Sequence, residues 1–181
     1  MRERAQIIQA LRRLSDLLKE KDIHGEICLL GGTVMVLGFQ ARSSTKDIDA
    51  VFAPIQPIRE AALIVQQEQG LPENWINDGA KGFVSVRHDS VEGDQPQFEN
   101  LRLTMPTPEY MLAMKCMASR ISEGLVERGD VADIRFLIRY LNLKGKEDVL
   151  GILGQYYPPD RVPPRAQFLV EDIFARPEEE R

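Results

Sequence analysis

The chain has 181 residues and a formal net charge of −5, a length that fits one domain or a small domain with a helical extension. The negative charge gives no general attraction to nucleic acids or anionic membranes, so a polyanion would need a local basic patch. The cysteines, Cys28 and Cys116, lack metal-ligand spacing and lie far apart, which argues against a disulfide framework. The longest nearly apolar run, residues 27–39, is too short to span a bilayer, and no signal peptide is recognisable. We therefore expect a soluble, cytoplasmic protein without a membrane segment.

The first 105 residues alternate between helical and strand patterns. Apolar residues at helical spacing predict helices, and short apolar or alternating runs predict strands. In chain order, the expected elements are a helix (4–21), a strand (27–30), a helix (34–40) capped by Thr33, a strand (47–52), a helix (58–69) and two strands (83–86 and 98–104). The pair Gly31-Gly32 ends the first strand, and residues 70–79 have the composition of an irregular connection.

After Pro106 the patterns are helical throughout. Thr107 and Pro108 form a favourable helix start, as N-cap and first helical residue, for a helix that extends to Ile121. Further helices are expected from Gly129, over residues 146–155 and over residues 165–175. The sequence thus predicts an α/β (α+β) fold, in which a small mixed-sheet core (1–105) flanked by helices precedes a C-terminal helical region (106–181) packed on it.

Two acidic residues stand out on the strand predicted over residues 47–52. Asp47 and Asp49 are two residues apart, so both carboxylates should share one face while Ile48 and Ala50 point to the other. Two carboxylates on one face suit a hard divalent cation, Mg²⁺ or Mn²⁺. Each signal alone is more often structural, a solvated strand face for the acid pair and a turn for Gly-Gly. Their combination, in this order and with the expected elements between them, favours one particular fold.

These motifs resemble a known signature. Leu30-Gly31-Gly32-Thr33, followed by Arg42-Ser43-Ser44-Thr45-Lys46-Asp47-Ile48-Asp49, is similar to the signature of the nucleotidyltransferase superfamily that includes DNA polymerase beta. The closer resemblance is to the abortive-infection nucleotidyltransferase toxins and their uncharacterised bacterial relatives. Glu109 to Lys115 and Arg128 to Asp133 resemble the helical Lys and Asp-x-x-Asp motifs of that group. The resemblance covers about residues 25–140.

The resemblance implies an enzyme that moves a nucleoside monophosphate from an NTP to a hydroxyl group. The acceptor would be RNA, such as tRNA, or a protein, and a cognate antitoxin would be a further partner. Asp47 and Asp49 would hold Mg²⁺ or Mn²⁺. Gly31, Gly32 and the helix start at Thr33 would cradle the phosphates. Further phosphate contacts are expected from the polar loop, through Arg42, Ser44 and Lys46.

Two residues of the helical half complete the set of candidate catalytic residues. Lys115 lies on the apolar side of its expected helix, a costly place for an ammonium without a partner. It is therefore a candidate phosphate ligand, although a long stem can also carry the charge to the surface. Asp130 fits an N-cap, whereas Asp133 lies among apolar residues and would pair with Lys115 or reach the metal.

The third carboxylate that active superfamily members usually carry on a later strand is not obvious. Glu99 is the best-placed acid, and Arg102 occupies the alternate face of the same expected strand. If Arg102 points into the site, it replaces a metal-bound acid or marks a disabled enzyme. The alternative function is therefore a catalytically disabled protein that acts as a nucleotide-binding or protein-interaction module, and a plain structural domain is a third possibility.

Overall fold

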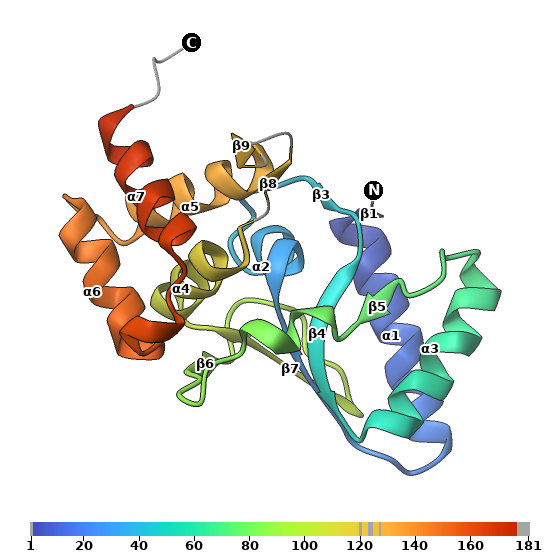
Figure 1. The fold of residues 1–181 in the computed structure, drawn as a ribbon. Helices are drawn as coiled ribbons and strands as arrows, with labels where there is room; N and C mark the ends of the chain where they lie inside the picture. The colour runs from blue at the N-terminus through green and yellow to red at the C-terminus, as the bar shows by residue number, and fades with distance from the viewer. Residues whose placement is uncertain (1, 120, 123–124, 127, 177–181) are drawn as a thin grey trace. The chain divides into compact units, whose positions relative to one another are not determined.

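The computed structural model describes residues 2–119, 121–122, 125–126 and 128–176. The chain divides into two compact units (Figure 1): Met1–Gly82 with Ser90–Pro106, and Phe83–Asp89 with Thr107–Arg181. A mixed five-stranded sheet with helices forms the first unit, and the second is mainly helical. The predicted α/β class is therefore confirmed.

The first unit is built on a sheet whose strand order is β5-β4-β2-β7-β6. The strands are β2 (Gly25–Leu29), β4 (Ile48–Ala53), β5 (Ile76–Asn77), β6 (Ser90–Val91) and β7 (Leu101–Pro106). Strand β2 is antiparallel to β4 and parallel to β7, while β5 runs parallel to β4 and β6 antiparallel to β7. A separate antiparallel pair joins β1 (Arg2–Glu3) to β3 (Ser44–Thr45).

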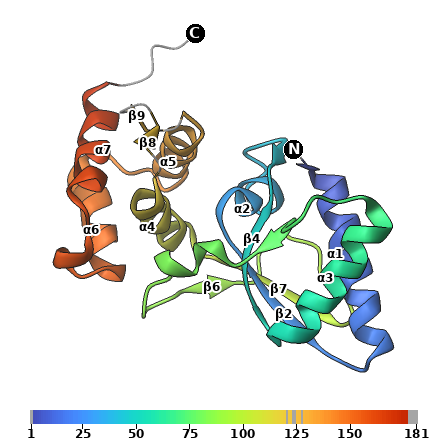
Figure 2. The same cartoon turned by 45° about the vertical axis from the view of Figure 1, so that its right-hand side comes forward.

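Two helices bury one face of this sheet. Helices α1 (Arg4–Glu20) and α3 (Ile55–Gln69) lie side by side on it, as both ribbon views show (Figure 2). The core side chains are Leu11, Leu14, Leu18, Ile27, Leu29, Ile48, Ala50, Ile58, Val65, Leu101 and Leu103, none more than 1% exposed. Because strand side chains alternate, the opposite face carries the intervening residues, among them Asp49, and these are less buried.

The helix after β2 begins earlier than expected. Helix α2 spans Gly31–Leu37, so Thr33 lies inside the helix and Leu30 occupies the N-cap position. Gly31 has a φ of +56°, in the left-handed region that favours glycine. This conformation lets the chain turn from β2 into α2 without a linker, which is why the predicted cap at Thr33 was wrong.

Two strand predictions in the first 105 residues also need correction. Residues 83–86 do not form a strand: Gly79–Phe83 is a 3₁₀ helix (η1), and the Ser85 N–H donates to Tyr110 Oη at 2.8 Å instead of to a strand. Conversely, the expected irregular connection contains β5. The last expected strand is shifted, since β7 begins at Leu101 rather than at Phe98.

The second unit is organised around α4 (Pro108–Ala118). Residues 110–117 of α4 are buried around the whole helix, because α5 (Arg128–Tyr140), α6 (Lys146–Tyr156) and α7 (Pro164–Ala175) all pack on it. Thr107 is the predicted N-cap, with its side chain accepting the Tyr110 N–H at 3.4 Å. Helix α4 ends at Ala118, earlier than predicted, because Ile121 belongs to β8 (Ile121–Ser122), which pairs with β9 (Leu125–Val126). A short 3₁₀ helix, η2 (Pro159–Arg161), precedes α7.

Both cysteines are free thiols. Burial raises the pKa of Cys28, which is half-buried, and raises that of the fully buried Cys116 to about 12. No disulfide framework exists, as expected. Within the described residues, no helix has the length and apolar character needed to cross a bilayer.

Candidate functional site

Of the two carboxylates predicted to act together, Asp47 directly precedes β4 and Asp49 is its second residue. Ile48 and Ala50 are 0% exposed, whereas Asp47 and Asp49 are only half-buried. This burial pattern agrees with the predicted alternation, with both acids on the face opposite α1 and α3. Both acids are therefore on the face of the sheet that α1 and α3 do not cover.

The structure brings Gly31 against Asp49. The Leu30 N–H donates to the Asp49 carbonyl at 2.7 Å, which ties the end of β2 to β4. A Cβ atom added at Gly31 would lie 2.5 Å from Asp49 Oδ2, closer than such atoms can approach. Glycine is therefore required here for two reasons, the positive φ and the space that the carboxylate occupies. The Gly-Gly turn and the Asp-x-Asp strand, separate in sequence, form one site.

The second glycine lies beside the polar loop. A Cβ at Gly32 would lie 2.6 Å from Thr45 Oγ1 and 3.7 Å from Arg42 Nη1, so the Arg42 guanidinium is close to the turn. Ser44 is half-buried in β3 and pairs with Glu3, while the Lys46 side chain is exposed. Of the three loop residues predicted to bind phosphate, Arg42 is the one that the described geometry places at the glycines.

Two threonine hydroxyls hold the backbone of the first acid. Thr33 Oγ1 and Thr45 Oγ1 each donate to the Asp47 carbonyl oxygen at 3.2 Å. A carbonyl oxygen has two lone pairs, so both hydroxyls can bind it at once. Thr33, which is 0% exposed, therefore anchors the start of β4 from inside α2 instead of capping that helix.

Asn77 is a member of the site that the sequence did not reveal. In the register of β4 and β5 it lies opposite Asp49, and its Nδ2 donates to Asp47 Oδ2 at 3.5 Å. Residues 70–79 show no periodic pattern, which is why they were expected to be irregular. The sequence offers one weak signal: apolar Ile76 followed by polar Asn77 has the same order as Ile48 and Asp49 on the neighbouring strand.

Neither candidate for the third acidic position belongs to this site. Glu99 is exposed and forms an ion pair with Lys19, with 2.6 Å between Nζ and Oε2. Arg102 is also exposed and contacts Glu92 at 2.6 Å and Glu26 at 3.7 Å. In register, Glu26 faces Ala53, at the opposite end of β4 from Asp49. Arg102 therefore does not take the place of a metal-bound acid.

In the second unit, Lys115 is held by two carboxylates of α5. Its Nζ lies 2.6 Å from Asp133 Oδ2 and 3.4 Å from Asp130 Oδ1. All three side chains are buried, at 9%, 2% and 5% exposure for Lys115, Asp133 and Asp130. The predicted pairing of Lys115 with Asp133 is confirmed, and Asp130 does more than the expected capping. A buried ammonium needs such partners, so this cluster ties α4 to α5.

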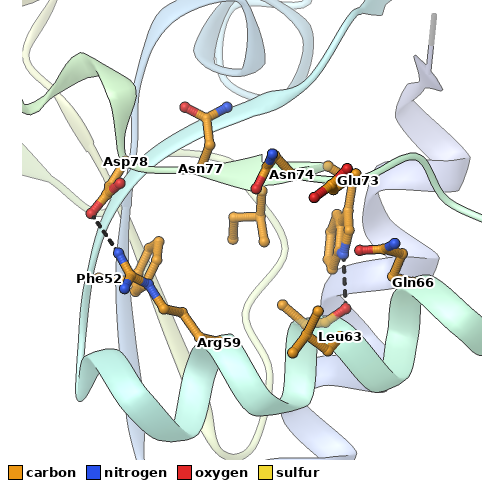
Figure 3. A pocket seen from close by; sticks show the side chains of 11 residues that line it. Phe52, Arg59, Leu63, Gln66, Glu73, Asn74, Asn77 and Asp78 are labelled. Carbon is orange, nitrogen blue, oxygen red and sulfur yellow. Dashed lines mark hydrogen bonds and ion pairs between the residues drawn. The ribbon is translucent and has the colours of Figure 1, made fainter.

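A cavity of about 320 Å³ lies between α3 and β5 (Figure 3). Its apolar wall includes Phe52 and Ile76, which belong to the face of the sheet that α3 covers. At one end Arg59 Nη2 donates to Asp78 at 3.2 Å, and at the other the Trp75 Nε1–H donates to the Ala62 carbonyl at 2.9 Å. Asn77, the strand partner of Asp49, is also among the residues that line the cavity.

The residues around Asp47 and Asp49 suit a cation bound by two carboxylates. Among the described residues, no group of three or more His, Cys, Asp or Glu side chains is placed to hold a metal. Mg²⁺ in proteins is commonly held by one or two carboxylates, with water and substrate phosphates as the other ligands. Searches against protein-family models, curated proteins and solved structures gave no significant match to the chain.

Proposed function

We propose that the protein is a nucleotidyltransferase, dependent on Mg²⁺ or Mn²⁺, that moves a nucleoside monophosphate from an NTP to a hydroxyl group of RNA or protein. One observation carries the proposal: the Gly31 backbone lies so close to the Asp49 carboxylate that a Cβ would be 2.5 Å from it. A turn that can accept phosphates and a pair of acids that can hold a cation then share one place. This is the combination that the transfer of a phosphoryl-linked group requires.

In this proposal the acid pair holds the cation. Asp47 and Asp49 present two carboxylates on one face, and the Thr33 and Thr45 hydroxyls fix the backbone beneath the first of them. When bound, the cation would neutralise the triphosphate and stabilise the charge on the leaving pyrophosphate. Mg²⁺ with two carboxylates leaves coordination positions for the phosphates of the substrate.

The turn and the polar loop would bind the phosphates. Gly31 and Gly32 have no side chains, so their backbone N–H groups can approach a phosphate closely. Arg42, beside Gly32, would add a positive charge, and Ser44 and Lys46 on the same loop are further candidates. This division of roles puts cations near the phosphates and anions near the metal.

Lys115 and Asp133 enter the proposal with a condition. Lys115 is bound to Asp133 and Asp130, so a contact with phosphate requires it to exchange one of these carboxylates for a phosphate oxygen. The same exchange would free a carboxylate oxygen to accept a proton or meet a cation. Lys115 is thus proposed as a phosphate ligand that, before substrate binds, is paired with Asp130 and Asp133.

A second candidate function is a catalytically disabled module that binds nucleotides or another protein. The set of two carboxylates, without a third acid beside them among the described residues, favours it. Such a module would still bind Mg²⁺ with an NTP, because the phosphates supply the missing negative ligands. Turnover therefore separates the two functions, and nucleotide binding alone does not.

The experiment compares label transfer from NTPs by three full-length proteins. Wild type, Asp47→Asn and Asp16→Asn are each incubated with labelled NTPs, Mg²⁺ and bacterial tRNA. Asp16 is an exposed carboxylate on α1, so its variant makes the same charge change away from the acid pair. We expect transfer by wild type and Asp16→Asn, and a loss of about 100-fold or more in Asp47→Asn.

Equal labelling by wild type and Asp47→Asn would remove the assignment of the site. If no protein transfers label, calorimetry with each NTP, with and without Mg²⁺, decides between the remaining cases. Tight binding that needs Mg²⁺ supports the nucleotide-binding module, and no binding supports a scaffold.

We further propose that the enzyme acts in the cytoplasm as the toxin of a toxin–antitoxin pair, a role for which the sequence resemblance is the support. Expression in bacteria should arrest growth with wild type and with Asp16→Asn, but not with Asp47→Asn. A cognate antitoxin would be the partner that relieves the arrest. Normal growth with all three proteins would leave the transferase proposal standing and remove the toxin role.

A further inference from the structure

The amide of Asn77 has a single orientation that its neighbours determine. Its Oδ1 accepts the backbone N–H of Gly79 at 2.9 Å. A backbone N–H is a donor and never an acceptor, so the oxygen of the amide must be at this end. The other end, Nδ2, then faces Asp47 Oδ2, which it meets at 3.5 Å. Asn77 thus offers the acid pair a donor and not an oxygen ligand.

The position of Asn77 in the sheet puts it beside both acids. It is the direct partner of Asp49 in the parallel pairing of β4 and β5, and Ile76 is the partner of Ile48. Side chains opposite each other in a pair of strands share a face. Figure 3 shows Asn77 among the residues that line the cavity, with its side chain directed away from α3. The side chains of Asp47, Asp49 and Asn77 therefore lie together on the face of the sheet opposite α3.

We infer that Asn77 is a positioning residue of the acid pair, and that its neutral amide makes the site dependent on the triphosphate for cation binding. This inference rests on the proposed function. By donating to Oδ2 of Asp47, the amide directs that oxygen toward β5 and so orients the carboxylate. Because the third group is neutral, the site offers a divalent cation fewer negative ligands before the substrate arrives, and the cation enters together with the NTP phosphates.

The substitution Asn77→Asp tests this inference without removing the local turn. An aspartate keeps one oxygen to accept the Gly79 N–H, and its second oxygen replaces the amide nitrogen beside Asp47. A third carboxylate increases the affinity of an oxygen-ligand site for a divalent cation when its charge is close to the ion. Asn74→Asp is the matched control, since it adds the same charge at the same sheet edge, and its φ of +56° is tolerated by Asp.

The measurement is Mn²⁺ binding by the full-length protein without nucleotide, followed by electron paramagnetic resonance of the free ion. We expect wild type and Asn74→Asp to bind weakly and with equal affinity, and Asn77→Asp to bind on the order of tenfold or more tightly. Adding a nonhydrolysable ATP analogue should raise the affinity of wild type and bring it close to that of Asn77→Asp.

Equal Mn²⁺ binding by Asn77→Asp and Asn74→Asp would overturn the inference while leaving the transferase proposal intact. Tight binding by wild type in the absence of nucleotide would also overturn it, because two carboxylates and an amide would then suffice. Asp47→Asn keeps the two results apart. If that variant binds Mn²⁺ with the ATP analogue as well as wild type does, the proposed metal site itself is wrong.

Discussion

Replacement of Gly31 by alanine should destabilise the protein through the carboxylate of Asp49. Two effects add at this position. The φ of +56° is strained for any residue with a Cβ, and that Cβ would lie 2.5 Å from Asp49 Oδ2 and 3.4 Å from Asp49 Cβ. Gly70, the residue that follows α3, allows the two effects to be measured separately. Its φ is also positive, at +61°, but no heavy atom lies within 4 Å of an added Cβ. Gly70→Ala therefore carries the strain without the clash.

The magnitudes follow from these contacts. The left-handed conformation costs alanine about 1–2 kcal/mol, offset by about 0.4–1 kcal/mol because alanine restricts the unfolded chain. Gly70→Ala should thus lower the free energy of unfolding by about 1 kcal/mol. Gly31→Ala should lose a further 1–3 kcal/mol, roughly, because the Asp49 carboxylate must leave its position. At about 2–4 °C per kcal/mol for a chain of this length, the additional loss corresponds to roughly 2–12 °C in Tm.

A double-mutant cycle with Asp49→Ala isolates the clash. Chemical denaturation gives the free energies of unfolding of Gly31→Ala, Asp49→Ala and the double variant, with Gly70→Ala in both backgrounds as the control. When Asp49 is alanine, Gly31→Ala should cost about as much as Gly70→Ala, since the atom at 2.5 Å is gone. If Gly31→Ala costs the same with and without the Asp49 carboxylate, the contact between the turn and the acid is refuted.

Further substitutions and one chemical modification test separate parts of the structure. Lys115→Met should lower the free energy of unfolding by about 3–5 kcal/mol in chemical denaturation, because Asp130 and Asp133 stay buried without their cation. Replacing both aspartates by asparagine in the same chain should recover much of this loss. Thr33→Val should cost no more than about 1 kcal/mol in the same assay, because a second hydroxyl also donates to the Asp47 carbonyl; a loss of several kcal/mol would contradict this shared bond. At pH 8 a thiol-alkylating reagent should modify half-buried Cys28 faster than Cys116, whose pKa of about 12 keeps the thiol protonated. Because burial raises the pKa of Cys116 from 9.0 to about 12, the folded state holds this proton more tightly than the unfolded state does. The resulting contribution to stability is fully present below pH 9 and is lost as the pH rises toward about 12. Cys116→Ala should therefore lose less of its free energy of unfolding over this pH range than wild type.

The long amphipathic segments were predictable because local patterns determine them. Helix α1 spans Arg4–Glu20 where the spacing of apolar residues predicted residues 4–21, and Thr107 caps α4 as its type and position indicated. The shared face of Asp47 and Asp49 was equally local, since it follows from the two-residue period of a strand. Propensity, period and caps act over a few residues, and the sequence displays them directly.

The start of α2 and the strand β5 were not predictable in this way. Helix α2 can begin at Gly31 because this glycine adopts the left-handed conformation. Thr33 has the composition of an N-cap, so the sequence favoured a later start. Strand β5 has two residues, too few to show a period, and it exists because it pairs with β4. Residues 76–77 are a strand because β4 offers them backbone hydrogen bonds, and their own sequence does not show this.

Local sequence patterns were enough to identify the double glycine and the two carboxylates and to predict that both acids share one face of their strand. Tertiary structure decided that they meet: the closing of β2 against β4 puts Gly31 at Asp49, and the parallel pairing of β5 brings Asn77 to Asp47. It also decided that Glu99 and Arg102 are surface ion-pair residues. Local periodicity orients a side chain relative to its own strand, whereas the choice of neighbouring strand depends on burying apolar surface across the whole sheet.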